Sequence, residues 1–169
     1  MIRFSFTLFL FILSSCASDP TVGYSSSSLY ATQFRSVAVP IFENNTMVRE
    51  IEFMLTDAVI KEIESRTPYQ ILGEQLADTL ITGTIRSVDL RTISQSRTTG
   101  LDNEVMITVV MDFEWLNLQS GGRIMGRRNF SSSALFVPSR PSAEPIEMGQ
   151  FAVVQQLSQD IVDQMQSSW

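Results

Sequence analysis

The stretch from Val105 to Leu116 alternates so regularly that it predicts a β-strand. Apolar side chains occupy every second position, and the positions between them are mixed. Because successive side chains of a strand point to opposite faces, one face is wholly apolar and the other carries polar groups such as Asp112 and Glu114. That contrast is typical of an antiparallel sheet covered on one side only. The apolar face comprises Val105, Ile107, Val109, Met111, Phe113 and Trp115.

Further strands are predicted on both sides of this one. Ser36 to Phe42 is a short apolar strand in which Pro40 indicates an edge or a strand end, since proline cannot donate to a ladder. Thr79 to Leu90 changes parity between Ile85 and Val88, which indicates a bulge, and Gly83 is the expected place for it. The polar residues 91–103 predict a loop. The turn 119–122 leads into a returning strand, 123–130, followed by a long proline-containing loop.

Two segments have helical periodicity. The first runs from Met47 to Ser65, follows N-cap candidates in residues 43–46, and ends at Thr67-Pro68. The second covers about Met148 to Gln166 and carries a run of glutamines that is either a solvated face or a neutral hydrogen-bonding surface inside a partner. The predicted buried stripes are Val48, Ile51, Leu55, Ala58, Val59 and Ile63 in the first, and Phe151, Val154, Leu157, Ile161 and Met165 in the second; the glutamines are Gln155, Gln156, Gln159 and Gln164.

The order is therefore strand, helix, three strands, helix. Two amphipathic helices and one apolar sheet face predict an α+β two-layer sandwich, with both helices packed on one face of a mostly antiparallel four-stranded sheet. We expect a single domain over residues 34–169.

The first fifteen residues have the layout of a secretory signal peptide. Arg3 precedes an apolar run from Phe4 to Leu13, and a helix of about ten residues spans only about 15 Å, half of a bilayer core. Leu13-Ser14-Ser15-Cys16 resembles the bacterial lipobox, which implies cleavage before Cys16 and its acylation. Ala17 implies sorting to the outer membrane. Residues 16–33 are expected to form a lipidated, flexible tether.

Composition excludes several kinds of chemistry. The chain has no histidine and one cysteine, so it has neither an imidazole metal ligand nor a Ser-His-Asp or Cys-His nucleophile, and no cofactor is expected. The 12 basic and 18 acidic residues give a net charge of −6, and loss of Arg3 with the signal makes it −7. That balance argues against a nucleic-acid partner.

Several motifs of the chain resemble the lipopolysaccharide-assembly lipoprotein LptE family, and the match extends over nearly the whole mature chain. The strongest part is the strand, proline and asparagine-threonine turn from Ser36 to Thr46. The other motifs are Gly23-Tyr24, Glu50, Leu55-Thr56-Asp57-Ala58, Ala77-Asp78 and Ile81-Thr82-Gly83-Thr84-Ile85.

The resemblance implies a lipoprotein that sits inside the outer-membrane β-barrel LptD, helps it assemble, plugs it, and binds lipopolysaccharide on its way to the cell surface. The sequence itself contributes arginines, which bind phosphate bidentately and pack their stems on apolar chains. They lie at loops and strand ends, as Arg86, Arg91 and Arg97 around one connection and Arg123, Arg127 and Arg128 beyond the hairpin turn. We take Arg91, Arg97, Arg127 and Arg128 as candidate lipopolysaccharide-binding residues.

Two alternatives remain. One is an accessory lipoprotein of another envelope assembly, since similar strand-proline motifs occur in curli-type secretion lipoproteins. The other is a periplasmic hydrolase that uses Asp112 and Glu114, a carboxylate pair that alternation on a sheet face also produces by chance. We expect a non-enzymatic binding protein.

Overall fold

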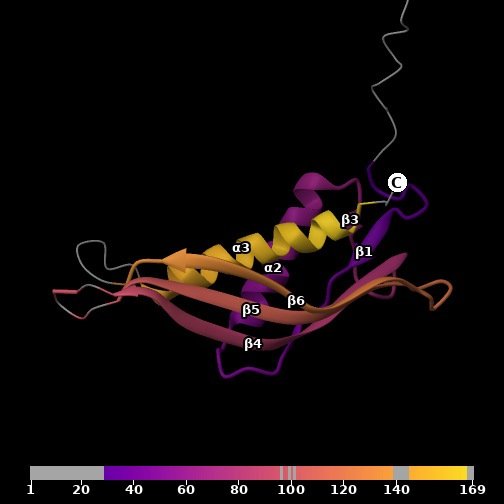
Figure 1. Ribbon diagram of the computed structural model, residues 1–169. Helices are drawn as coiled ribbons and strands as arrows, with labels where there is room; N and C mark the ends of the chain where they lie inside the picture. Colours follow the sequence, from indigo (N-terminus) through magenta and orange to yellow (C-terminus); the bar gives the residue numbers. More distant parts are fainter. Residues whose placement is uncertain (1–28, 96, 99, 101, 139–144, 167–169) are drawn as a thin grey trace, which may run out of the picture.

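The computed structural model shows a curved sheet with two helices on one of its faces (Figure 1). It describes residues 29–95, 97, 98, 100, 102–138 and 145–166. The elements are β1 (Ser36–Ala38), β2 (Glu43–Asn44), α2 (Ile51–Arg66), β3 (Gln70–Ile71), β4 (Thr79–Gln95), β5 (Asp102–Asn117), β6 (Arg123–Phe136) and α3 (Ile146–Gln164). The α+β class and the helices on one face are as predicted.

The predicted four-stranded, mostly antiparallel sheet is wrong in detail, because the sheet is mixed and has six strands in the order β3-β1-β4-β5-β6, with β2 also paired to β4. β1 is parallel to β3 and β4, and β2 is parallel to β4. Parallel neighbours need a crossover, which α2 provides between β1 and β3. Only β4, β5 and β6 form the predicted antiparallel meander.

Of the predicted strand 36–42 only Ser36–Ala38 is strand, as β1, and Pro40 lies beyond its end. β2 lies at Glu43–Asn44, among the residues predicted to cap the first helix. The first helix begins later than predicted, after Glu50, whose φ of 71° places it in the left-handed region, and no side chain caps it. Asn44 instead holds the loop before the helix. Its Nδ2 donates to the carbonyl of Val48 and to Glu52, both at 2.7 Å, and its Oδ1 accepts from the Thr46 N–H at 2.9 Å.

The meander strands are longer than the sequence predicts. β4 reaches Gln95 and β5 begins at Asp102, so most of the predicted loop 91–103 is strand, and β6 continues six residues past the predicted end at Phe130 to Phe136. The bulge in β4 lies at Arg86, where the register shifts between Ile85 and Ser87, and not at Gly83. It returns Val88 and Leu90 to the side of the sheet that carries Ile81 and Ile85.

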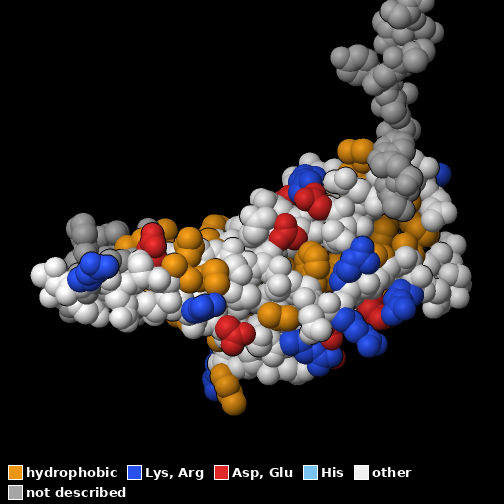
Figure 2. Space-filling model, in the orientation of Figure 1, with side chains coloured by type: hydrophobic (Ala, Val, Ile, Leu, Met, Phe, Trp, Pro, Cys, Tyr) orange, Lys and Arg blue, Asp and Glu red, His pale blue; other side chains and the backbone are white. Residues whose placement is uncertain are grey.

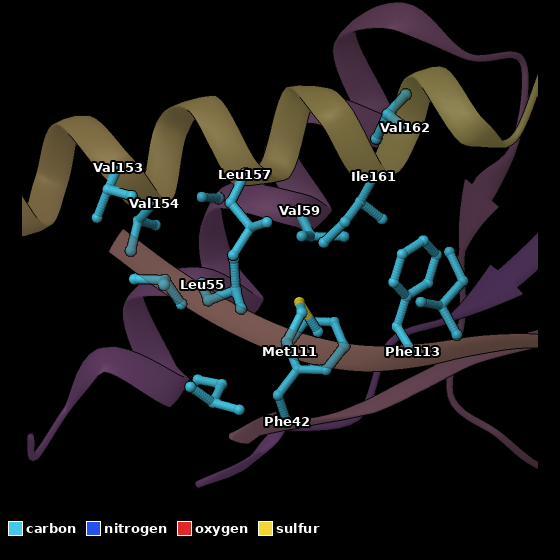
Figure 3. Packing of buried hydrophobic residues seen from close by; sticks show 14 of the residues in the cluster. Phe42, Leu55, Val59, Met111, Phe113, Val153, Val154, Leu157, Ile161 and Val162 are labelled. Carbon is cyan, nitrogen blue, oxygen red and sulfur yellow. The ribbon is translucent and has the colours of Figure 1, made fainter. Parts of the chain in front are cut away.

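The core lies between the sheet and the two helices (Figure 3). Val59 of α2 and Leu157 and Ile161 of α3 approach Met111 and Phe113 of β5, and all five side chains are almost completely buried. The predicted buried stripe of the first helix is confirmed except that Val48 lies outside the helix. In the second predicted helix, the burial predicted for Val154, Leu157, Ile161 and Met165 is confirmed. The burial predicted for Phe151 is wrong, since this side chain is 58% exposed near the N-terminus of α3.

The meander divides into two halves that we name by their ends. The hairpin half comprises residues 79–85, 111–117 and 123–130 and ends at the β5–β6 turn. The free half comprises residues 87–95, 102–110 and 131–136. β1, β2 and β3 flank only the hairpin half, because β2 pairs with β4 no further than Ile85.

Candidate functional site: an arginine-lined groove

A groove of about 900 Å³ crosses the hairpin half on the sheet face that the helices leave open. Basic and acidic side chains gather at this end of the sheet, at the lower right of Figure 2. The lining residues are Glu43, Thr82, Gly83, Thr84, Arg86, Asp112, Phe113, Glu114, Arg123, Ile124, Met125, Gly126, Arg127 and Arg128.

Irregularities in β6 create the groove on this face of the sheet. The register between β5 and β6 shifts between Met111 and Phe113, and Asn129 has a φ of 52°. Asparagine tolerates that conformation better than most side chains. Gly126 lies opposite Glu114, where an added Cβ would meet Arg123 Cδ at 3.2 Å. Its missing side chain therefore leaves room for Arg123 beside Glu114.

Asp112 organises the floor of the groove. Its Oδ1 accepts the N–H of Asn129 at 2.8 Å, and its Oδ2 accepts from Arg86 Nε at 3.0 Å and Nη2 at 2.8 Å. The Asn129 hydrogen bond, followed by the Arg86 guanidinium, holds the pKa of the Asp112 carboxyl below its usual value. One ionised carboxylate thus fixes the bulge in β4 and the bulge in β6 together.

The four arginines of the groove fall into two pairs. Arg86 and Arg123 form salt bridges with Asp112 and Glu114, at 2.8 and 2.9 Å. Arg127 donates instead to the neutral Gln164 Oε1 at 2.9 Å. Arg128 forms no salt bridge or hydrogen bond with the described residues. Neither Arg127 nor Arg128 forms a salt bridge with a carboxylate of the described residues, although Arg128 interacts electrostatically with Asp112. Both side chains are exposed, so their guanidiniums have donors left for an anion.

The structure separates the four candidate arginines. Arg127 and Arg128 line the groove, whereas Arg91 lies opposite Met106 in the free half and Arg97 lies in the turn beyond it. Met106 and Phe113, the β5 partners of Arg91 and Arg127, are seven residues apart, or about 24 Å along the strand. Cys16, the candidate lipid-attachment residue, lies outside the described residues.

Arg86 and Arg123 were among the arginines noted in the sequence but were not selected as binding residues. Their spacing to Asp112 and Glu114 depends on the β4–β5 and β5–β6 registers, and on bulges of which only the one in β4 was predicted, at another position. The carboxylate pair considered for hydrolysis lies in the groove, but each member is bound to an arginine. Among the described residues, no group of three or more histidine, cysteine, aspartate or glutamate side chains is arranged to hold a metal ion.

The glutamine-bearing side of α3 is only partly solvated. Gln156 and Gln159 are exposed, while Gln155 and Gln164 are half-buried. Gln156 donates to Asp160, which in turn accepts a hydrogen bond from Ser132 of β6. A search of the described helices finds none that is both long and apolar enough to cross a bilayer.

The fold and the groove define a two-layer α+β domain with an open, arginine-lined sheet face. Solved structures share this fold. The protein XCC0632 from Xanthomonas campestris has a TM-score of 0.61 at 11% identity, over 80% of this chain and 86% of that one. CT253 from Chlamydia trachomatis has a TM-score of 0.55 at 9% identity, over 78% of this chain and 95% of that one. The PelC dodecamer subunit from Paraburkholderia phytofirmans has a TM-score of 0.52 at 15% identity, over 84% of this chain and 96% of that one.

The family model for LptE, described as lipopolysaccharide-assembly, matches residues 34–168. The chain therefore belongs to the LptE family and is a lipopolysaccharide-assembly lipoprotein. A search of curated protein sequences gave no significant match.

Proposed function

We propose that the protein binds lipopolysaccharide while it sits inside an outer-membrane LptD barrel, which it plugs and helps to assemble. The Arg127–Arg128 pair carries the lipid-binding part of this proposal. Both residues line the groove and neither forms a salt bridge, in a chain of net charge −6. Arg128 interacts electrostatically with Asp112, and Arg127 reaches from the edge of β6 to Gln164 of α3. Phosphate groups of an anionic glycolipid match the planar, bidentate donors of arginine.

Arg91 and Arg97 would provide a second contact, at the other end of the sheet. Arg91 stands in one cross-strand row with Met106 and Leu135, and Leu135 is 59% exposed. A guanidinium beside apolar side chains suits an amphiphile, but this face has no described groove. We therefore assign the headgroup to the groove and treat the free-half arginines as auxiliary.

Binding of purified lipopolysaccharide to the mature protein tests this assignment. Arg127→Gln/Arg128→Gln should weaken binding at least tenfold, because each charged hydrogen bond contributes about 1.5 to 3 kcal/mol before screening and about 1.4 kcal/mol corresponds to a factor of ten. The loss should be greatest at low ionic strength. Arg91→Gln/Arg97→Gln is the matched control and should have the smaller effect. Equal binding by all variants, indifferent to salt, would remove the groove from the proposal.

The partner is tested separately by recovering the tagged, lipidated protein from its own membranes in mild detergent. One large LptD-type barrel should copurify in near-equal amount. Recovery of a barrel from a different secretion system would favour the curli-type alternative.

Anchoring through Cys16 is the remaining part of the proposal. Two or more acyl chains hold a protein stably, whereas a short apolar segment does not. Cys16→Ala should therefore leave a precursor that is not processed or a protein that does not partition into detergent. A variant that matured and fractionated with the outer membrane would contradict the assignment of the anchor. The signal peptide 1–15 and the tether 16–33 are part of the same proposal.

A further inference from the structure

The edges of this sheet are protected from further strand pairing everywhere except along one segment of β6. β3 is an edge of only two residues, Gln70 and Ile71. The free side of β4 from Arg86 to Gln95 carries Arg86, Asp89 and Arg91 and has register shifts near both ends. Short edges, charges and bulges are the devices by which proteins block edge pairing.

β6 itself contains both kinds of edge. Residues 123–129 carry Arg123, Arg127 and Arg128, two register shifts and the left-handed Asn129. Residues 130–136, Phe-Ser-Ser-Ser-Ala-Leu-Phe, have no charge, no proline and no register shift against β5. Within the described part of the chain, no strand pairs with the outer edge of this segment.

The helix beside this edge offers exposed glutamines and one carboxylate, Asp160, that is bonded to the edge strand. The bond between Ser132 and Asp160 places α3 over β6, and Gly149 lets the start of the helix lie directly on Phe136, where an added Cβ would meet the ring at 2.6 Å. Gln156, bonded to Asp160, and Gln159 are exposed on α3. An incoming strand would thus meet backbone donors and acceptors beside amides, and the nearby charge of Asp160 already accepts hydrogen bonds from Ser132 and Gln156.

We propose that residues 130–136 accept an extended strand of the barrel partner, which adds to the sheet next to β6. This inference rests on the proposed function for the identity of the partner. The edge selects an extended chain because its unpaired N–H and C=O groups recur at every second residue.

The occupant is another protein rather than a second copy of this one. Antiparallel self-pairing about Ser133 would set Ser133 against itself and Ser132 against Ala134. The same register sets Leu135 against Ser131, and Phe130 against Phe136, which is already buried. One ladder of this length therefore adds little buried apolar surface, far from the area that a stable dimer requires. The small side chains of β6 instead leave room for large side chains on the incoming strand.

A matched pair of substitutions tests the inference. Ser87, Val110 and Ser131 form one cross-strand row, so Ser131→Lys places a charge on the unprotected edge and Ser87→Lys places the same charge on the opposite edge. Each is expressed in the lipidated full-length protein, and recovery of the barrel in mild detergent is measured. Ser131→Lys should reduce recovery about tenfold, the equivalent of losing one or two ladder hydrogen bonds, while Ser87→Lys retains it.

Equal recovery with both variants overturns the inference while leaving the barrel partnership intact. Failure of the unaltered protein to recover a barrel overturns the proposed function, and this inference with it. If thermal melting shows that the Ser131→Lys protein is unfolded, photocrosslinking from a Ser133→p-benzoylphenylalanine variant tests the inference instead. Photocrosslinks to an extended segment of the barrel support the inference, and crosslinks only to a second copy, or none to the barrel, overturn it.

Discussion

The hairpin half and the free half of the meander use the same three strands, yet they differ in what surrounds them. In the hairpin half, β4 has β1 and β2 on its other side, and Ile81 and Ile85 are fully buried. In the free half, β4 has no such neighbour, and Leu90, on the same face, is 48% exposed. Burial of an apolar side chain here depends on the neighbouring elements rather than on the strand's own pattern.

The same contrast holds at the two ends of β5. Trp115 packs against Phe34 and Tyr69 with ring centroids 5.9 and 6.0 Å apart, and Tyr69 packs on Tyr30. Tyr30 lies within the segment 16–33 that the sequence assigns to the tether. The hairpin half is thus closed by aromatic contacts from the start of the domain, and it is the half that carries the groove.

The largest expected difference between the halves comes from core truncation. Phe113 is almost completely buried and meets Phe130 edge to face at 5.2 Å, so Phe113→Ala should reduce the free energy of unfolding by about 3 to 5 kcal/mol. Leu90→Ala in the free half should cost less than about 1 kcal/mol, because half of the side chain is already in water. Chemical denaturation measures both, and similar losses would mean that the halves are equally packed.

Two glycines that line the groove, Gly83 of β4 and Gly126 of β6, differ in how closely other residues approach them. A Cβ at Gly83 would meet the Asp112 carbonyl oxygen at 2.5 Å and Phe113 Cβ at 2.9 Å. Gly83→Ala should therefore cost about 1 to 3 kcal/mol, as overpacking does. An added Cβ at Gly126 meets only flexible side chains, Arg123 Cδ at 3.2 Å and Glu114 Cγ at 3.5 Å, so Gly126→Ala should cost clearly less. A Gly83→Ala protein as stable as the Gly126→Ala protein would show that the close approach of β4 and β5 is not required.

The smallest expected effect is a loss of folding stability at acid pH that comes from Asp78, next to the hairpin half. Asp78 accepts N–H groups of Arg35 at 2.9 Å and Ser36 at 3.2 Å, and the Arg35 bond is the main cause of its lowered pKa. A carboxyl whose pKa is lower in the folded state stabilises the fold above its unfolded pKa of about 3.9, and loses that effect as pH falls through the folded value.

Asp78→Asn should therefore be less stable than the wild type at neutral pH, and the difference should narrow below about pH 4. Urea denaturation at neutral and acid pH measures it. A difference that stayed constant over this range would show that the ionised form of Asp78 contributes nothing to β1.

The periodicity of the sequence predicted those elements that contact the core along their whole length. The α2 stripe and the inward face of β5 are buried as expected, because both elements contact the core along their length. The pattern could not predict where β4 and β6 end. Residues 91–95 are polar except for Ile93, and residues 131–134 are polar or small, yet pairing with β5 still extends both strands.

The groove was predictable only in part. The sequence places Arg123, Arg127 and Arg128 together beyond the hairpin turn, but their approach to Arg86 depends on strand registers that bring distant residues together. The parallel strands were missed for a related reason. β2 and β3 each have two residues, too few to produce a periodic signal, and only the crossover by α2 defines their direction.

Hydrogen exchange of the mature protein with and without purified lipopolysaccharide tests most directly the claim that the hairpin half holds the lipid site. Without ligand, residues 79–85 should exchange slowly and residues 87–95 faster, because only the former have strand neighbours on both sides. With lipopolysaccharide, the account predicts added protection in residues 123–128 and 112–114, and none in 87–95. Protection confined to residues 87–95, or no change around the groove, would contradict it.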